Sequence, residues 1–261
     1  MFEFEADFYD SKSQVQYNLG LKLIEFLNIQ NNENILDIGC GPGRLTLEIA
    51  KMTTEGLVIG VDYNQDMIIK ALENLWKSGL TNTQFICENI LQYEPEMQFN
   101  AIFSNSALHW IQETQELYQK IYTILAPGGR LIAQMPAKGS LDKFISAFMA
   151  PIQPLGFSEF FRNWSYPIKF ISTKALQRIL SSIGYIDMQI WEEDQEIQFQ
   201  TSQEVLDFLK TASIVPILSQ LPLEKRDSYL SYLLDIINQR AEELLSVTMR
   251  RLFVIAKKGV E

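Results

Sequence analysis

The fold of this chain follows from the stretch Ile35-Leu36-Asp37-Ile38-Gly39-Cys40-Gly41-Pro42-Gly43. Its first residues predict a buried strand, and the glycines that follow let the backbone turn tightly into a helix. The free N–H groups at the start of that helix can face a ligand. Asp37, two positions before the first glycine, would repel a pyrophosphate but can pair with the ammonium group of an amino acid. The turn therefore favours a ligand that carries an amino-acid moiety.

Strand-like and helix-like segments alternate on both sides of this turn. Apolar residues recur every four positions from Gln14 to Asn28, which predicts an amphipathic helix. Further along we expect strands at 34–38, 57–61, 83–87, 100–104 and 130–135, and helices at 43–52, 66–77 and 112–125. This order indicates an α/β fold with a doubly wound, Rossmann-like parallel sheet, helices on both faces and right-handed crossovers.

The pattern changes after Pro136. Residues 139–170 contain eight aromatic side chains, and prolines interrupt them. Helices are expected near 173–183, 203–212 and 223–243, with a strand from 186 towards 199 and a last strand at 249–256. We therefore assign residues 1–138 to a Rossmann-like core with an N-terminal helix. Residues 139–245 form a helical cap and substrate-binding region that includes late core elements, and residues 246–261 form the final core strand.

Composition and charge limit the classes of partner. The chain of 261 residues is 47% hydrophobic and 21% charged, which suits a globular protein with a substantial core. Its net charge of −10 disfavours nucleic acid and anionic membranes, because phosphate contacts need clustered Lys and Arg. We expect a small-molecule substrate instead. The sequence gives no indication of the oligomeric state.

Targeting signals and metal motifs are not recognisable in the sequence. The acidic start, Met1 to Asp7, does not resemble a signal or transit peptide. No apolar run reaches the roughly 20 residues that a membrane helix needs. Only Cys40 and Cys87 occur, far apart, so we predict neither a disulfide framework nor a metal site. These features favour a reduced, cytoplasmic protein.

A second carboxylate follows at the end of the second predicted strand. Asp62 lies about 20 residues after the glycine turn, where a carboxylate can accept hydrogen bonds from both hydroxyls of an adenosine ribose. The alternative is a charge that complements the dipole of the next helix, and this role fits Asp66 better than Asp62. Asp62 is therefore a candidate for ribose binding.

These motifs, together with Glu88-Asn89-Ile90 and Leu125-Ala126-Pro127-Gly128-Gly129, resemble those of class I S-adenosylmethionine-dependent methyltransferases. The resemblance implies a seven-stranded Rossmann-like sheet whose last strand is antiparallel. It implies S-adenosyl-L-methionine as the cofactor, S-adenosyl-L-homocysteine as the product, and no metal. The motifs that carry it lie mainly in the first half of the chain.

The resemblance also implies a set of cofactor-binding residues. They are Asp37, Gly39, Cys40, Gly41, Asp62, Tyr63, Met67, Asn89, Ile90 and Asn105. The family more often has Asp where Asn89 stands, but an Asn side-chain oxygen can still accept a hydrogen bond from the adenine amino group. Tyr9 and Gln16 lie in a segment that resembles one folding over the cofactor, which makes both candidates for the methionine carboxylate. The alternatives are a surface aromatic and a helix-face amide.

Three further segments narrow the resemblance. Residues 103–110, Gln134-Met135-Pro136 and residues 251–256 resemble the trans-aconitate and juvenile-hormone-acid methyltransferases, which act on carboxylates. This likeness implies O-methylation of a carboxylic acid, and the aromatic cap favours an acid with an apolar body. The candidate substrate-binding residues are Trp110, Phe144, Phe148, Trp164 and Tyr166. Their alternative role is packing in a core.

His109 is the only histidine and follows the fourth predicted strand, at the edge where ligands of this fold bind. A phenol or a protonated amine would need a general base, and His109 is the candidate. A carboxylate is already ionised at neutral pH, so His109 or Gln134 would then orient one of its oxygens. The alternatives are therefore N-, C- or phenolic O-methylation with His109 as base, or a cofactor-binding protein without transferase activity. Asp37 argues against a nicotinamide-dependent oxidoreductase.

Overall fold

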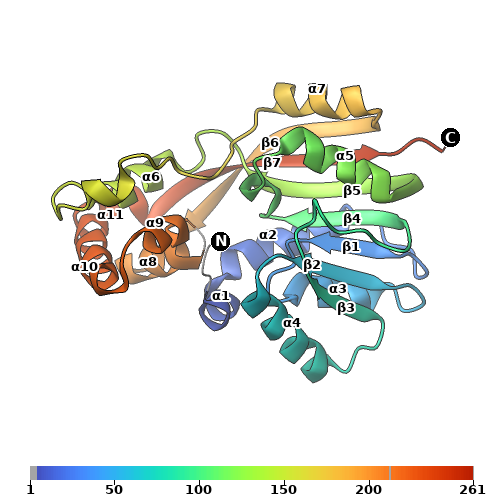
Figure 1. The fold of residues 1–261 in the computed structure, drawn as a ribbon, viewed down its shortest axis with the longest axis horizontal. Coiled ribbons are helices and arrows are strands. Elements are labelled where there is room, and N and C mark those ends of the chain that lie inside the picture. The colour runs from blue at the N-terminus through green and yellow to red at the C-terminus, as the bar shows by residue number, and fades with distance from the viewer. Residues whose placement is uncertain (1–4, 212, 261) are drawn as a thin grey trace.

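The computed structural model describes residues 5–211 and 213–260, and in this part of the chain seven strands form one sheet (Figure 1). The strand order is β3-β2-β1-β4-β5-β7-β6, and β7 runs antiparallel to both of its neighbours. The strands are β1 (Ile35–Ile38), β2 (Val58–Asp62), β3 (Thr83–Cys87), β4 (Phe99–Asn105), β5 (Leu125–Pro136), β6 (Ile186–Gln198) and β7 (Ser246–Lys257). The predicted Rossmann-like sheet with an antiparallel last strand is confirmed. Residues 1–4, 212 and 261, which fall within the assigned regions 1–138, 139–245 and 246–261, lie outside the described residues.

Helices cover both faces of the sheet. They are α2 (Gln14–Glu25), α3 (Arg44–Met52), α4 (Gln65–Ser78), α5 (Thr114–Ile124) and α7 (Thr173–Ile183). The short helix α1 (Ala6–Lys12) contacts α4 and the helix α8 (Ser202–Thr211) instead. Side chains of α2 and α3 share one apolar core with the sheet, and side chains of α5 and α7 share the other. Both faces of the inner strands are therefore buried, whereas most residues of the edge strand β6 are exposed or half-buried.

Neighbouring residues of the inner strands point into opposite cores. On β1, Ile35 packs on the α2–α3 side and Leu36 on the α5–α7 side. On β7, Phe253 and Leu252 divide in the same way. A strand buried on both faces needs apolar residues at every position, which explains the uninterrupted apolar runs in the sequence.

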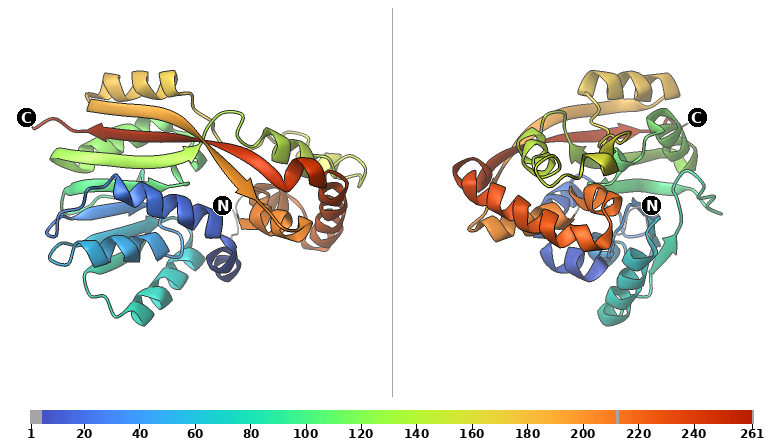
Figure 2. Two further views of the ribbon diagram at one scale, coloured as in Figure 1. Left: turned by 180° about the vertical axis from the view of Figure 1, so that it is seen from behind. Right: turned by 60° about the vertical axis from the view of Figure 1, so that its left-hand side comes forward.

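A second body of helices forms a cap beside the sheet, around an apolar core of its own (Figure 1). Its helices are α6 (Asp142–Met149), the 3₁₀-helix η2 (Ser158–Phe161), α8 (Ser202–Thr211), α9 (Val215–Gln220), α10 (Leu223–Gln239) and α11 (Ala241–Leu244). Figure 2 shows β6 and β7 running from the sheet into this cap. Val254 of β7 packs in a sheet core, whereas Val247 and Met249 pack in the cap core. The two long strands thus connect the cap to the sheet.

Two local features differ from the sequence-based expectation. Residues 223–243 do not form one helix, because Arg240 has non-helical dihedral angles (φ −108°, ψ 26°) between α10 and α11. The segment around Tyr9 forms α1, which the periodicity analysis left unassigned.

Within the region 139–245, α7 packs on the sheet through Leu176 and Leu180, whereas the other helices form the cap.

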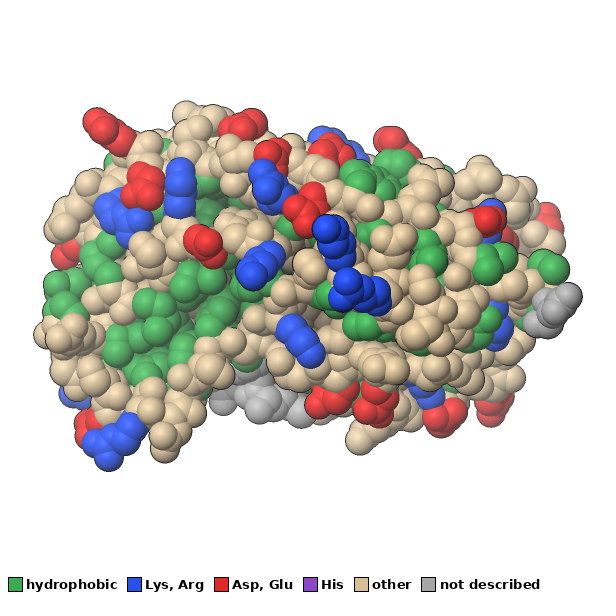
Figure 3. Space-filling view, turned by 90° about the horizontal axis from the view of Figure 1, so that it is seen from above, with side chains coloured by type: hydrophobic (Ala, Val, Ile, Leu, Met, Phe, Trp, Pro, Cys, Tyr) green, Lys and Arg blue, Asp and Glu red, His purple; other side chains and the backbone are tan. Residues whose placement is uncertain are grey.

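The surface carries charges of both signs. In Figure 3, Lys and Arg side chains lie among Asp and Glu side chains, and apolar side chains gather at the cap end. Within residues 5–211 and 213–260, no helix has both the length and the apolar character required to cross a membrane.

The cap core provides a stability test. Tyr229 of α10 is fully buried, and its hydroxyl donates a hydrogen bond to the carbonyl oxygen of Phe148 (2.7 Å). Tyr229→Phe leaves this buried carbonyl unpaired, so the free energy of unfolding should fall by about 1–3 kcal/mol in a urea titration. Tyr232→Phe on the same helix is the control, because its hydroxyl has no hydrogen bond to any described residue. Equal stabilities of the two variants would contradict this account of the cap.

Candidate functional site

Three cavities meet at the carboxyl edge of the parallel strands, and Tyr9 of α1 lines all of them. The large cavity has a volume of about 670 Å³, which is in the range of small-molecule sites. A pocket beside the glycine turn, which we call the glycine-turn pocket, has about 40 Å³. A third space between sheet and cap, the inner chamber, also has about 40 Å³.

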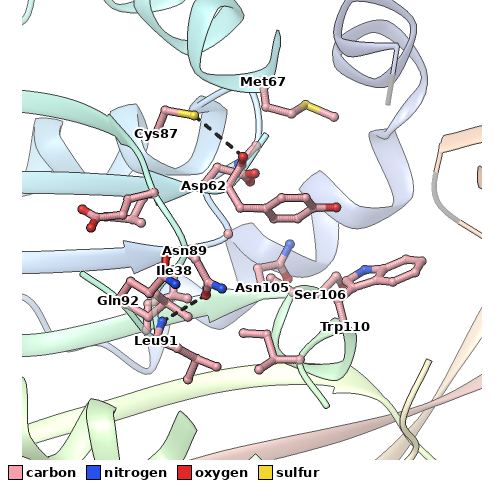
Figure 4. Close-up of a pocket in the computed structure, with 18 of the residues that line it drawn as sticks. Ile38, Asp62, Met67, Cys87, Asn89, Leu91, Gln92, Asn105, Ser106 and Trp110 are labelled. Carbon is pink, nitrogen blue, oxygen red and sulfur yellow. Dashed lines mark hydrogen bonds between the residues drawn. The ribbon is translucent and has the colours of Figure 1, made fainter. Parts of the chain in front are cut away.

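The large cavity is lined by residues that follow four successive strands of the sheet (Figure 4). Asp62 ends β2 and Asn89 lies just after β3, while Trp110 lies in the 3₁₀-helix η1 (Leu108–Trp110) after β4. The sequence-predicted residues that line this cavity are Tyr9, Gly39, Gly41, Asp62, Tyr63, Met67, Asn89, Ile90, Asn105 and Trp110. The fold thus brings together most of the predicted cofactor residues.

The glycine turn requires glycine for two different reasons. Gly39 has a positive φ (71°), and a Cβ there would lie 2.2 Å from the Cβ of Ala107. Gly41 also has a positive φ (53°), but a Cβ there would meet only the Tyr9 ring, at 3.8 Å. Its backbone N–H donates to a carboxylate oxygen of Asp62 (3.0 Å). The turn therefore packs tightly against the loop after β4 and remains open towards the cavities.

Asp62 is held by backbone donors alone. Besides Gly41, the N–H of Asn64 donates to its other oxygen (2.9 Å). Burial raises the pKa of Asp62 above its ordinary value, although these hydrogen bonds act in the opposite direction. No Lys or Arg in the described part of the chain forms an ion pair with it. Its carboxylate can therefore accept hydrogen bonds from ligand hydroxyls.

Asp37 lines the glycine-turn pocket, together with Gln16 and Cys40, rather than the large cavity. Burial raises its pKa to about 7, the nearby Asp62 carboxylate acts in the same direction, and the hydroxyl of Thr46, which donates to Asp37 (2.6 Å), opposes the rise. Among the described residues no cation pairs with Asp37. Two buried carboxylates near each other suit a cationic ligand, and an amino-acid ammonium group fits this requirement.

The predicted adenine contacts, Asn89 and Met67, both line the large cavity. The Asn89 side-chain oxygen accepts a hydrogen bond from the backbone N–H of Leu91 (3.1 Å), as Figure 4 shows. This bond fixes the orientation of the amide beside the cavity. Met67 is buried at the start of α4, where its N–H donates to the side chain of Asn64 (3.0 Å).

A buried polar network connects β7, β5 and β4. Arg251 donates from Nε to the side-chain oxygen of Gln134 (2.7 Å) and from Nη2 to the hydroxyl of Ser106 (2.5 Å). The Gln134 amide nitrogen donates to Ser106 (3.1 Å) and to Asn105, and Asn105 donates to the backbone carbonyl of Gln16 (3.0 Å). The predicted catalytic residue Gln134 therefore orders the loop after β4 and uses its amide within the protein.

His109 lies in the inner chamber and does not line the large cavity. Burial, and secondarily the positive charge of Arg251, lower the pKa of His109 to about 3. Its ring packs against Trp110 with 5.3 Å between centroids, and its Nδ1 is buried without a hydrogen-bond partner among the described residues. The imidazole is therefore neutral at physiological pH and has an unused polar atom.

Most of the predicted substrate residues pack within the cap. Phe144 and Phe148 are fully buried in its core. Tyr166 donates from its hydroxyl to the carbonyl oxygen of Ser213 (2.8 Å), and Trp164 packs against its ring. None of these four aromatic residues is among those lining the large cavity or the inner chamber in the described part of the chain, whereas Trp110 lines both.

Sequence reasoning missed Arg251 as a site residue. A signal was present, because side chains of β7 alternate between buried Val247, Met249 and Arg251 and exposed Thr248 and Arg250. Of two consecutive arginines in a strand, one must point inward. The resemblance drew attention to residues 251–256 without indicating which side chain has a role.

Comparisons with known proteins bear on the family and the fold. The family described as a methyltransferase domain matches residues 29–166. The trans-aconitate 2-methyltransferase of Escherichia coli is 23% identical over 246 residues, which are 91% of each chain. The YcgJ protein of Bacillus subtilis superposes with a TM-score of 0.62 at 16% identity, covering 93% of this chain and 98% of that one. Phosphoethanolamine N-methyltransferase 2 of Haemonchus contortus, in complex with S-adenosyl-L-methionine, gives 0.58 at 20% identity, covering 93% and 53%.

The buried carboxyl of Asp37 leads to a pH-dependent stability. It binds its proton more tightly in the folded state, where its pKa is about 7, than in the unfolded chain, where the pKa is about 4. Its contribution to stability is therefore complete below pH 4 and is lost as the pH rises to 7 and above. Relative to Asp37→Asn, the ligand-free protein should lose on the order of 2 kcal/mol of unfolding free energy between pH 5 and 8.

Urea titrations at several pH values measure this difference. Asp235→Asn, at an exposed position on α10, controls for the removal of one carboxylate. A difference between the wild type and Asp37→Asn that stays constant from pH 5 to 8 would contradict the assignment of Asp37.

Proposed function

The chain belongs to the methyltransferase domain family, and on that premise we propose that it methylates a carboxylate oxygen of a small acid with an apolar body. The enzyme is a class I S-adenosylmethionine-dependent methyltransferase that acts on a small molecule. What we propose is that the acceptor of the methyl group is a carboxylic acid. The observation that carries it is the buried, neutral His109 in the chamber next to the large cavity.

S-adenosyl-L-methionine is the cofactor, and the described residues fit it. Asp62 would bind the ribose, Met67 and Asn89 would contact the adenine, and Asp37 would lie near the cationic end of the methionine moiety. When bound, the cofactor supplies a methyl group on a positively charged sulfur and leaves as S-adenosyl-L-homocysteine. Every other contribution comes from side chains that orient the acceptor and exclude water.

The acceptor is expected in the inner chamber. Tyr9, Ser106 and Trp110 line both this chamber and the large cavity, so they mark the place where the two reactants would meet. Holding a nucleophile about 3 Å from the carbon that it attacks removes several kcal/mol of barrier. Ser106 belongs to the buried network through its contact with Gln134 (3.1 Å), which favours a fixed geometry at this place.

The state of His109 favours an acceptor that is already ionised. Its imidazole has a pKa of about 3. Proton transfer to it from a phenol, whose pKa is about 10, would cost on the order of 10 kcal/mol. A carboxylate has a pKa near 4, so its oxygen can attack without losing a proton first. The neutral His109 can then serve as a hydrogen-bonding group.

The walls of the inner chamber favour an apolar acid. They include Leu141, Ile168, Phe208 and Met249, which belong to the cap core or to its edge. A volume of about 40 Å³ has room for little more than a carboxylate group. The body of the acid must therefore displace part of the cap, and we expect the cap to move when the substrate enters.

Contacts between the N-terminal helices and the cap are the ones that such a movement must break. Lys12 of α1 pairs with Asp207 of α8 (2.9 Å). Gln16 of α2 donates to the hydroxyl of Thr211 (3.0 Å). Each of these two polar contacts contributes about 1 kcal/mol or less. Val15 of α2 also packs against the cap core, and Lys210 of α8 lies over the ring of Phe8 of α1 (4.2 Å to the centroid), so the movement must break these contacts too.

The loss of rate in a His109 variant separates the two roles of His109. With saturating S-adenosyl-L-methionine and a panel of apolar monocarboxylates as acceptors, activity should stay nearly constant from pH 6 to 8, because neither the acceptor nor His109 titrates in that range and the cofactor's ammonium group would keep Asp37 ionised. His109→Asn keeps a hydrogen-bonding side chain and should lower the rate about tenfold, equivalent to about 1.4 kcal/mol.

A general base would behave differently. His109→Asn would then cost about 10²- to 10⁴-fold. Methyl transfer to phenols or amines alone, with this large loss in the variant, would contradict the acid proposal. Methyltransferase activity itself would remain.

A further inference from the structure

We propose that Arg251 binds the carboxylate that becomes methylated and restricts the enzyme to acids with a single carboxylate near the reacting group. This inference rests on the function proposed above and assigns a specificity-determining residue to it. It starts from a buried cation in the inner chamber whose neighbours do not neutralise it.

Arg251 is only 3% exposed, yet both of its hydrogen-bond acceptors, Gln134 and Ser106, are neutral. No Asp or Glu among the described residues forms an ion pair with it. Burial lowers the pKa of Arg251 to about 9, so the guanidinium still carries its charge at neutral pH. A buried charge without a partner is costly for folding, and proteins keep such groups mainly where a ligand provides the opposite charge.

The same chamber contains two further polar atoms without partners. His109 Nδ1 and the side-chain oxygen of Gln16 are both buried, and neither has a hydrogen-bond partner among the described residues. Both residues line the inner chamber with Arg251. Buried polar groups are nearly always paired in folded proteins. The guanidinium and the His109 nitrogen, which donates when it carries the imidazole proton, match a carboxylate in this small space, whereas the Gln16 oxygen is an acceptor and would need a donor elsewhere on the ligand.

The polar network leaves part of the guanidinium free. Arg251 uses one N–H of Nε and one of Nη2 for Gln134 and Ser106. A guanidinium has five N–H donors in a planar fork. Because Gln134 is itself fixed by its contact with Ser106 (3.1 Å), the fork is held rigidly and its remaining donors are available to the chamber. A carboxylate could accept two of them side by side.

The charge distribution limits the number of carboxylates. Arg251 is the only Lys or Arg among the described residues that line the inner chamber. The carboxylate of Asp62, which would repel a second negative charge, lines the adjoining large cavity, and Tyr9 lines both spaces. A tricarboxylate such as trans-aconitate would bring two charges without partners. The site therefore differs in charge from what the substrate of the similar Escherichia coli enzyme requires.

The reaction changes the charge that Arg251 contacts. One carboxylate oxygen forms a bond to the methyl carbon as the carbon–sulfur bond breaks, and no proton moves. The product is a neutral ester, which no longer pairs with the guanidinium. Arg251 should therefore bind the acid more tightly than the ester and favour release of the product.

Calorimetric titration of the protein saturated with S-adenosyl-L-homocysteine tests this inference. The probes are octanoate, phenylacetate and cinnamate, each compared with its primary amide. The wild type should bind at least one of these acids about 10- to 100-fold more tightly than the amide. Arg251→Gln should abolish this preference by weakening acid binding and leaving amide binding nearly unchanged. Arg251→Lys should restore part of the preference.

Arg250→Gln is the matched control, because the neighbouring Arg250 is exposed and pairs with Asp194 (2.7 Å). It should bind acids and amides as the wild type does. Binding of S-adenosyl-L-homocysteine by each variant shows whether the fold is intact. If Arg251 only supported the fold, Arg251→Gln would weaken acids and amides alike. An acid preference that survives Arg251→Gln, or none in the wild type, would overturn the proposal.

Two outcomes separate this inference from the proposed function. Methyl transfer to acids with an unchanged KM in Arg251→Gln would retain the function and overturn the role of Arg251. Acids that bind through Arg251 but accept no methyl group would retain the binding site and overturn the function. Tighter binding of trans-aconitate than of the monocarboxylates would overturn the restriction to a single carboxylate.

Discussion

Uncompensated buried charge at the carboxyl edge of the sheet is the constraint on which the site depends. Asp37 and Asp62 place two carboxylates on one side of Tyr9, and Arg251 places a guanidinium on the other. None of the three has an ion-pair partner in the described part of the chain. Burial of such groups costs folding free energy, and a ligand of opposite sign beside them offsets this cost. The distribution of these groups supports the proposed meeting of a cationic cofactor and an anionic acceptor next to Tyr9.

The fold produces this separation of charge by simple means. Parallel strands β1 and β2 end side by side, so the residues that end them lie near each other. Strand β7 runs antiparallel to β5, so it enters the sheet from the cap at the edge where the parallel strands end. Arg251 therefore lies at this edge, paired with Pro136 of β5. The cap helices come from two insertions, one between β5 and α7 and one between β6 and β7, and cap residues such as Leu141 and Phe208 line the chamber together with Arg251. The last strand, β7, thus connects the inner chamber to the sheet.

The sheet, its order of elements and most of the large cavity could be predicted from the sequence, because glycine turns and strand-end carboxylates act through local geometry. The packing of the cap was more difficult to predict from the sequence. Phe144 and Phe148 are large aromatic residues of the kind that often contact substrates, but in this protein they fill the core of the cap. Only the packing of helices that are distant in sequence decides between these two roles. The environment of His109 was also unpredictable, since its low pKa results from burial and from Arg251, which is 142 residues away in the chain. Long-range contacts of this kind have no local signature.

The chemical nature of the transferred methyl group tests the account most directly. The enzyme would be incubated with methyl-labelled S-adenosylmethionine and an equimolar mixture of apolar monocarboxylates, phenols and amines, and the labelled products would be treated with mild alkali. The account predicts that the label is released as methanol, because a methyl ester hydrolyses under these conditions whereas a phenol ether or an N-methyl amine does not. Label that remains bound to phenols or amines after the alkali treatment would contradict it.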